Sequence, residues 1–247
     1  MKISIILPVF NEGVNLKIIL RIIQAIVKSS HEVLVVYDFP EDNSISVTQE
    51  IQKTYPEIRL VYNDKGRGAI NAIKKGVEEA KGKYAITLMA DDIGPIFAID
   101  AMADLMDKGC ELVSCTRYGY GGKVFGGSWI QKILSKTANK LFYFLSSSQL
   151  TDVTFGPKMF RPDFFKKITI ESKRGWAVAF ELSIKAQVAG LQVGEVPITS
   201  INRFYGGKAT FSLGSWLTEY LKWFLRGLRE LRNIKNLPPP LYKKAFE

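Results

Sequence analysis

The stretch YAITLMADDIGP, residues 84–95, decides the fold of this chain. A mostly apolar segment of strand length runs straight into two adjacent carboxylates, Asp91 and Asp92, and then into Gly94 and Pro95. An apolar run of this length bounded by turn residues is typical of a buried strand. In open α/β sheets, ligands bind at the carboxyl ends of the strands. The stretch therefore predicts a buried strand that ends beside a ligand site.

Apolar runs of strand length alternate with segments of helical period on both sides of this stretch. Successive β-α units of this kind form one mostly parallel sheet, so the predicted fold class is α/β. The expected strands cover residues 3–9, 33–37, 58–62, 84–89 and 112–115, and the expected helices cover 14–28, 44–55, 69–80 and 98–108. Later in the chain the sequence predicts helices over 128–145 and 176–189, a strand or hairpin around 153–160, and a short strand over 191–198.

Composition narrows the choice of partner and compartment. The chain has 247 residues, 47% of them hydrophobic, and a formal charge of +10, which indicates a partner that carries negative charge. Phosphorylated substrates and anionic lipid fit this charge, whereas no recognition module supports a nucleic acid. The two cysteines lack metal-ligand spacing, and neither a signal peptide nor an apolar run of membrane-spanning length is present. We expect a cytoplasmic protein whose contact with a membrane is peripheral, at its inner face.

Four carboxylates follow three of the expected strands: Glu12 after the first, Asp38 after the second, and Asp91 and Asp92 after the fourth. The carboxyl ends of parallel strands share one edge, so we expect these side chains on one rim. Magnesium is commonly held by one or two carboxylates together with substrate phosphates, and Asp91 and Asp92 suit that role. Asp92 could equally cap the helix that follows.

Several motifs together resemble those of family 2 inverting glycosyltransferases of the GT-A type, especially dolichol-phosphate mannose synthase-like enzymes. The matching stretches are LPVFNEGVNL (7–16), VLVVYDFPEDNS (33–44), GRGAINAIKKG (66–76), LMADD (88–92) and the long segment from GWAVAFEL to GGKATFS (175–212). The resemblance implies a GT-A nucleotide-binding sandwich over residues 1–213, followed by an amphipathic basic helix and tail over 214–247. It also implies a nucleotide-diphosphate sugar donor, a lipid-phosphate acceptor and Mg²⁺ or Mn²⁺.

The resemblance assigns roles to individual residues of this sequence. The nucleotide pocket would be formed by Pro8, Phe10, Glu12 and Ala90, with Asp38 beside the base; Asp91 and Asp92 would face the metal and diphosphate, and Arg117, Arg203 and Lys208 would contact phosphates. Where the family usually has Asp-x-Asp, this chain has Met89, Ala90 and Asp91, with Asp92 one position later. The set of metal ligands is therefore left open.

The acceptor decides whether a catalytic base is needed. A phosphate monoester is already an anion at neutral pH, because its second pKa is about 6. A sugar hydroxyl would instead need a base, for which Glu181 is the available candidate. His31 precedes the second strand, opposite the strand ends, and is expected to be structural. A non-catalytic nucleotide-sugar or membrane-surface binding protein is the third possibility, suggested by the altered Asp-x-Asp.

Two later helices could contact a membrane or pack on the protein. An apolar stripe on the tail helix is formed by Leu217, Leu221, Phe224, Leu228 and Leu231, with Trp216 and Trp223 nearby. A basic amphipathic helix of this kind can lie in a membrane interface. Apolar residues at 141, 142, 144 and 145 could guide an isoprenoid tail or belong to the core. Prolines prevent a helix beyond residue 235, where we expect a loose basic end.

Overall fold

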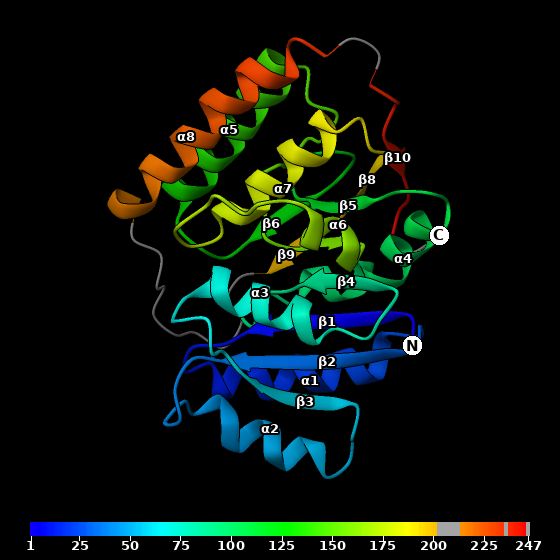
Figure 1. Cartoon of the computed structure of the whole chain (residues 1–247), viewed down its shortest axis with the longest axis vertical. Coiled ribbons are helices and arrows are strands. Elements are labelled where there is room, and N and C mark those ends of the chain that lie inside the picture. The colour runs from blue at the N-terminus through cyan, green and yellow to red at the C-terminus, as the bar shows by residue number, and fades with distance from the viewer. Residues whose placement is uncertain (202–212, 235–236, 246–247) are drawn as a thin grey trace.

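The structure is a computed structural model that describes residues 1–201, 213–234 and 237–245. One eight-stranded sheet runs through the molecule in the order β10-β8-β5-β7-β4-β1-β2-β3 (Figure 1). The first half contains β1 (Ile3–Pro8), α1 (Gly13–Ile26), β2 (His31–Tyr37), α2 (Ser44–Gln52), β3 (Ile58–Tyr62), α3 (Ala69–Glu79), β4 (Tyr84–Thr87), the 3-10 helix η1 (Gly94–Ala98), α4 (Ile99–Asp107) and β5 (Leu112–Thr116). The second half contains β6 (Lys123–Phe125), α5 (Trp129–Ser146), β7 (Lys158–Phe160), α6 (Pro162–Lys167), α7 (Ala177–Val188), β8 (Val193–Pro197), β9 (Thr199–Ile201), α8 (Leu213–Leu231) and β10 (Leu241–Tyr242).

The sheet is mostly parallel, as the sequence predicts. β1 lies between β2 and β4, and both pairings are parallel. β7 is the exception, because it runs antiparallel between β4 and β5. The strand expected around 153–160 is therefore shorter than predicted, and residues 150–157 form the loop that enters it. β6 and β9 pair with each other in a separate two-stranded sheet.

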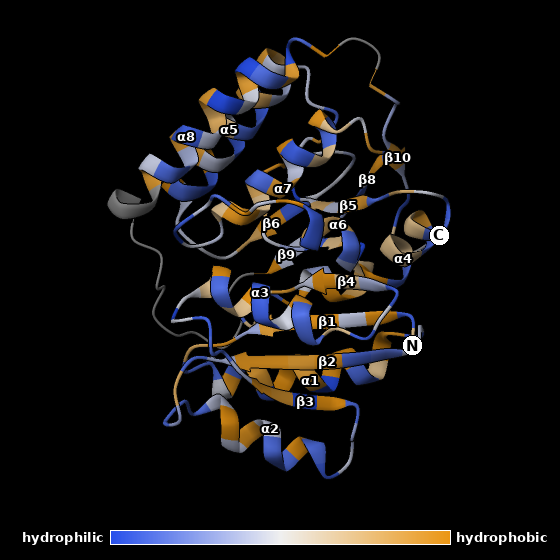
Figure 2. Cartoon of the chain, in the orientation of Figure 1, coloured by the Kyte–Doolittle hydropathy of each residue, from blue (hydrophilic) through white to orange (hydrophobic). Residues whose placement is uncertain are grey.

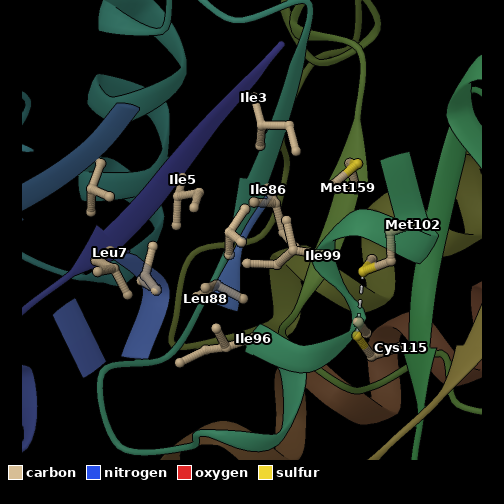
Figure 3. Close-up of a cluster of buried hydrophobic side chains, with 14 of the residues drawn as sticks. Ile3, Ile5, Leu7, Ile86, Leu88, Ile96, Ile99, Met102, Cys115 and Met159 are labelled. Carbon is tan, nitrogen blue, oxygen red and sulfur yellow. Dashed lines mark hydrogen bonds between the residues drawn. The ribbon is translucent and has the colours of Figure 1, made fainter. Parts of the chain in front are cut away.

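One face of the sheet is covered by α1, α2 and α4. Alternate residues of β1, which are Ile3, Ile5 and Leu7, point into this layer, as residues of period two on a strand must (Figure 3). In the same layer the thiol of Cys115 lies 3.5 Å from the sulfur of Met102. β1 and β2 are apolar over most of their length (Figure 2), which is typical of parallel strands buried on both faces.

The other face is covered by α3, α6 and α7, and α5 and α8 pack outside α7. Phe142 of α5 makes an edge-to-face contact with Phe180 of α7, with ring centroids 4.9 Å apart, and another with Phe224 of α8. Gly227 permits this approach, because a Cβ there would lie 2.5 Å from the Phe142 ring. The tail helix is thus part of the main body, and α5 and α8 lie side by side (Figure 1).

The end of the chain corrects one expectation. Residues 237–245 are not a loose tail, because β10 pairs with β8 at the edge of the sheet. The Tyr242 ring lies 4.3 Å from that of Tyr120, and Gln192 donates to the carbonyl of Pro239 at 2.8 Å. Prolines prevent a helix but allow an extended edge strand, and the sequence argument overlooked that second option. None of the described helices is both long and apolar enough to cross a membrane.

Candidate active site

The loops that follow β1 and β2 are joined at the carboxyl edge of the sheet. The backbone N–H of Asn11 donates to both carboxylate oxygens of Asp42, at 3.2 and 3.1 Å, and Gly13 N–H donates to Asn43 Oδ1 at 2.9 Å. Gly13 lets the loops approach closely here, because a Cβ would lie 3.0 Å from the carbonyl oxygen of Asn43. Short polar side chains thus satisfy the free amides at the start of α1 and hold both loops in one arrangement.

The residues assigned to a nucleotide pocket lie on these joined loops. Pro8 ends β1, and Glu12 immediately precedes α1. Phe10 is 51% exposed, and its ring centroid lies 5.3 Å from that of Phe39 on the neighbouring loop. The Arg67 guanidinium lies 5.4 Å from the Phe39 centroid. The structure thus places an exposed aromatic surface at the rim, which is suited to contact a planar base.

Asp38 connects the end of β2 to the start of α3. Its Oδ1 accepts from the Asn63 side-chain amide at 2.7 Å, and its Oδ2 accepts from Gly68 N–H at 2.8 Å. Gly68 precedes α3 with a φ of 118°, a conformation that favours glycine. Asn63, a residue that the sequence analysis missed, fixes the orientation of this carboxylate.

Asp92 is buried and bonded to its own chain. The side chain is 1% exposed, and Oδ1 accepts from the N–H groups of Gly94 and Ile201, both at 3.0 Å. The Ser200 hydroxyl donates to Oδ2. Burial raises the pKa of Asp92. The predicted role as a metal ligand would require these bonds to break, so the geometry favours a structural role in which Asp92 holds the loop after β4 against β9.

Asp91 occupies the more open position of the pair. It lies partly exposed at the rim, whereas Ala90 is buried beside it. The β9 backbone packs so closely on the following turn that a Cβ at Gly94 would lie 2.0 Å from the Thr199 carbonyl oxygen. The turn that follows Asp91 is therefore packed closely on β9.

Arg117 is held by an acid that the sequence analysis did not identify. Its Nε and Nη2 donate to the two oxygens of Asp152 at 2.7 and 2.9 Å, and its backbone N–H donates to the same carboxylate at 3.1 Å. The guanidinium lies 4.2 Å from the Phe155 ring centroid, and Nη2 also reaches Ser135 Oγ at 3.3 Å. The Asp152 charge keeps the pKa of Arg117 above its usual value despite burial.

Two further buried ionisable groups lie behind Arg117. Glu195 accepts from the backbone N–H and hydroxyl of Thr151, at 2.7 and 2.9 Å, and burial raises its pKa to about 7. Lys158 donates to Ser114 Oγ at 2.9 Å, and burial lowers its pKa to about 8. This cluster of Arg117, Asp152, Lys158 and Glu195, termed the buried charge cluster below, lies between β5, β7 and β8.

The alternative base is not placed for catalysis. Glu181 is fully buried, accepts from the N–H groups of Glu171 and Ser172 at 2.7 and 2.8 Å, and pairs with Lys185 at 2.7 Å. It anchors the loop before α7, which explains a glutamate in an otherwise apolar segment. His31 begins β2, at the edge opposite the rim.

Arg203 and Lys208 lie outside the described residues, in the segment that follows β9. Within the ranges 1–201, 213–234 and 237–245, no three histidine, cysteine or acidic side chains gather as a metal cluster. Magnesium is commonly held by one or two carboxylates together with substrate phosphates and water.

Two curated proteins are similar over most of this chain. A dolichol-phosphate mannosyltransferase of Pyrococcus furiosus is 27% identical over 231 residues, which cover 90% of this chain and 64% of that protein. A polyprenol monophosphomannose synthase of Mycolicibacterium smegmatis is 27% identical over 233 residues, covering 90% of this chain and 87% of that protein. The chain thus spans somewhat less than two thirds of the Pyrococcus relative.

Solved structures share the fold. Glucosyl-3-phosphoglycerate synthase of Mycobacterium tuberculosis, in complex with Mn²⁺, UDP and glucosyl-3-phosphoglycerate, superposes with a TM-score of 0.68 and 17% identity, covering 92% of this chain and 80% of that one. The same enzyme with Mg²⁺ and UDP gives a TM-score of 0.67 at 16% identity, covering 92% and 79%. The sheet is therefore that of a GT-A glycosyltransferase. The family model for glycosyl transferase family 2 matches residues 4–169, more than half of the chain, and the chain belongs to that family.

Proposed function

We propose that the chain transfers a sugar from a nucleotide-diphosphate sugar to a polyprenyl phosphate at a membrane surface. The observation that carries this proposal is the rim at the carboxyl edge of the sheet. There three adjacent strands are followed by Phe10, by Asp38 with Phe39, and by Asp91, and the rings of Phe10 and Phe39 are in contact. Family membership supports sugar transfer, and the names of both curated relatives support a polyprenyl phosphate acceptor.

The donor would lie along this rim. Its base would contact Phe10 and Phe39, with Pro8, Glu12 and Asp38 around it, and its diphosphate would lie toward Asp91. Asp91 fits a Mg²⁺ or Mn²⁺ site, because one partly exposed carboxylate together with phosphate oxygens and waters can hold such an ion. When bound, the ion would offset the charge that develops on the departing diphosphate. Arg203 and Lys208 are proposed to contact the same phosphates.

The chemistry needs no base from the protein. An oxygen of the acceptor phosphate, which is already ionised, forms a bond to the anomeric carbon while the bond from that carbon to the donor diphosphate breaks. The leaving nucleoside diphosphate takes the electron pair, and the configuration at the anomeric carbon inverts. The buried, fully bonded Glu181 argues against the alternative acceptor, a saccharide hydroxyl, which would need a base.

Arg117 would orient the acceptor phosphate. Asp152 occupies Nε and one hydrogen of Nη2, and this bidentate bond fixes the plane of the guanidinium. Ser135 Oγ accepts from Nη2 as well, so the two hydrogens of Nη1 would be available for an anionic oxygen. Ser135 of α5 touches the same guanidinium, so the start of α5 lies beside the proposed acceptor position.

Helices α5 and α8 would form the membrane face. Trp223 and Leu231 are buried in the protein, so the predicted interfacial stripe is corrected: part of it packs against the core. Two residues of the predicted stripe, Leu217 and Leu221, are about half exposed, as is Leu225 on the same helix. Helix α5 adds further apolar side chains that are about half exposed or more: Trp129, Ile130, Ile133, Leu134, Leu141, Phe144 and Leu145. Polar and apolar residues alternate along both helices (Figure 2). Exposed apolar rows flanked by lysines are typical of helices that lie in a membrane interface.

Calorimetric titration of nucleoside diphosphates, with and without Mg²⁺ or Mn²⁺, tests the donor half of the proposal. Metal-dependent binding of one nucleotide is expected, and transfer of the matching labelled sugar to polyprenyl phosphate in detergent tests the acceptor half. Transfer to a saccharide and not to polyprenyl phosphate would replace the acceptor assignment. Absence of both nucleotide binding and transfer would leave the non-catalytic alternative.

A further inference from the structure

A cavity of about 400 Å³ lies between the start of α3 and the loop over residues 170–175. It is distinct from the loops that carry Asp91 and Arg117. Three cations line it, Arg67 and Lys74 from one wall and Lys173 from the other, and Ser172 lies at the same wall as Lys173. The cavity adjoins the proposed donor rim, because Gly68 donates to Asp38 and Arg67 lies over the Phe39 ring, but none of its lining residues is assigned to the donor or the acceptor.

The cavity carries an excess of positive charge. Within the described part of the chain, none of these three cations makes an ion pair with an acidic side chain. The one acid in the wall, Glu171, is paired on both oxygens, with Lys185 at 2.9 Å and Arg226 at 2.7 Å. Those cations hold the pKa of Glu171 well below its usual value, so its carboxylate stays ionised. The negative charge is already balanced by Arg226 and Lys185. An anion entering the cavity would meet unpaired cations.

The amino end of α3 opens into the same space. The helix has 11 residues and begins at Ala69 without any side chain that caps it. Gly68 N–H is used by Asp38, but the first-turn amides of a helix have no partner within the helix. These amides and the helix dipole together favour an anion at this position.

A second and independent feature points to a ligand. Ser172 is 5% exposed, and its hydroxyl has no hydrogen-bond partner among the residues that the structure describes. Its backbone N–H, by contrast, is bonded to Glu181 at 2.8 Å, so the residue is fixed in place. Leaving a buried hydroxyl unpaired costs free energy in the folded state. A bound acceptor oxygen in the cavity would satisfy this donor.

We propose that this cavity binds a phosphate group. Three cations, the free amides of a helix start and one hydroxyl donor match the chemistry of a phosphate monoester or diester, which offers several anionic oxygens. The group could come from a soluble phosphorylated compound or from an anionic lipid headgroup. The second source is structurally reasonable, because the loop contacts the proposed membrane helix α8 through the Glu171–Arg226 pair and the bond from Lys173 N–H to Glu219.

Phosphate binding to charge-matched variants tests the site. Inorganic phosphate is titrated into the full chain at constant ionic strength without divalent metal, and binding is followed by calorimetry. The double variant Lys74→Gln/Lys173→Gln should bind phosphate about tenfold more weakly than the wild type, because two charge-assisted contacts are lost. The matched control Lys53→Gln/Lys81→Gln removes the same charge from exposed positions away from the cavity and should stay within about twofold.

Ser172→Ala separates a ligand contact from a merely buried hydroxyl. If the hydroxyl serves a phosphate, the variant should bind phosphate several-fold more weakly while its melting temperature without phosphate is unchanged or higher. Equal phosphate affinity in the wild type, Ser172→Ala and the lysine double variant would overturn the proposal, as would no phosphate binding by the wild type. These outcomes do not depend on nucleotide binding.

Vesicles identify the source of the phosphate. Phosphatidylcholine vesicles are compared with vesicles that also contain phosphatidylglycerol. If the lipid headgroup is the ligand, Lys74→Gln/Lys173→Gln should lose the preference for phosphatidylglycerol while Lys53→Gln/Lys81→Gln keeps it. If the double variant loses phosphate affinity but keeps this preference, the ligand is a soluble phosphate.

Discussion

Two regions place polar groups at the carboxyl edge of one sheet, but by different means. The first region is the rim after β1, β2 and β4, and the second is the region around β5, β7 and β8. In the first region, short acids accept from backbone amides of neighbouring loops, as Asp42 does for Asn11 and Asp38 does for Gly68. In the second region, the buried charge cluster pairs side chains from separate segments, as Arg117 and Asp152 do.

This difference predicts how substitutions act. A partly exposed rim carboxylate can be changed at little cost to folding, so its loss should appear mainly in binding and activity. Removing one partner from a buried ion pair leaves an uncompensated charge, which typically costs about 3–5 kcal/mol. Substitutions in the second region should therefore act mainly by lowering the free energy of unfolding. We expect them to affect activity only by displacing Arg117.

The largest expected effect is on activity, at Asp91. Asp91→Asn removes the charge proposed to hold the metal and diphosphate, and we expect sugar transfer to fall by about 1,000-fold or more. The melting temperature should change little, because the side chain lies partly exposed at the rim. Transfer of labelled sugar to polyprenyl phosphate measures this, and activity within a few-fold of wild type would exclude Asp91 from the site.

Asp92→Asn provides the matched comparison one residue later. The change disturbs bonds from Gly94, Ile201 and Ser200, so we expect a loss of about 2–3 kcal/mol in the free energy of unfolding. Urea denaturation measures it. If Asp92→Asn instead abolished metal-dependent nucleotide binding with its stability intact, Asp92 would be a ligand after all.

Asp152→Asn tests the second region directly. The amide leaves Arg117 buried without its counter-charge, and the expected loss in the free energy of unfolding is about 3 kcal/mol. Lys83→Gln serves as a control, because it breaks an exposed ion pair with Asp107 and a contact with the Tyr84 ring, and it should cost less than about 1 kcal/mol. Similar small losses in both variants would mean that the cluster is not what fixes Arg117.

Sequence alone predicts the first region well, because its signals are local. The strands end within one or two residues of the positions expected from apolar runs, and the polar rim follows from the parallel order of those strands. The resemblance assigned Phe10 to a nucleotide pocket and Asp38 to a position beside the base, and in the structure the Phe10 ring contacts that of Phe39, the residue after Asp38. Phe39 was available as a signal, since it directly follows Asp38.

The second region could not be predicted in the same way. Asp152 lies 35 residues from Arg117 in sequence, just before the stretch that was expected to be a strand or hairpin. Periodicity does not reveal which distant acid will meet a given arginine. The tail helix shows a related limit, because its apolar residues lie on more than one face of the helix. The sequence could not tell that Trp223 packs inward while Leu221 stays exposed.

Three exposed leucines of α8 test the proposed membrane face. The triple variant Leu217→Ser/Leu221→Ser/Leu225→Ser should bind phosphatidylglycerol vesicles about 100-fold more weakly, since each half-exposed leucine would lose part of its transfer free energy. Vesicle sedimentation measures the partition. The melting temperature without vesicles should be unchanged, and unaltered vesicle binding would mean that this row faces something other than lipid.

The last expected effect is a pH dependence of stability from the buried charge cluster. Glu195 has a pKa of about 7 in the folded protein against 4.5 for an ordinary glutamate, so between these values the folded state holds more protons and stability falls as pH rises. Lys158 has a pKa of about 8 against 10.5, so between those values the unfolded state holds more protons and stability rises with pH. Each slope can reach at most about 1.4 kcal/mol per pH unit.

The two groups therefore predict a minimum in their combined contribution between about pH 7 and pH 8. Urea denaturation of the wild type and the variants from about pH 4 to about pH 11 measures this contribution, because that range extends about three units beyond each shifted pKa. Glu195→Gln should remove the fall on the acid side, and Lys158→Met should remove the rise on the alkaline side. Exposed Lys53→Met should remove neither, because an exposed lysine has nearly the same environment in both states. Parallel curves for wild type and Glu195→Gln would mean that Glu195 is ionised in the folded protein throughout this range, held by the bonds from Thr151 and not neutralised by burial.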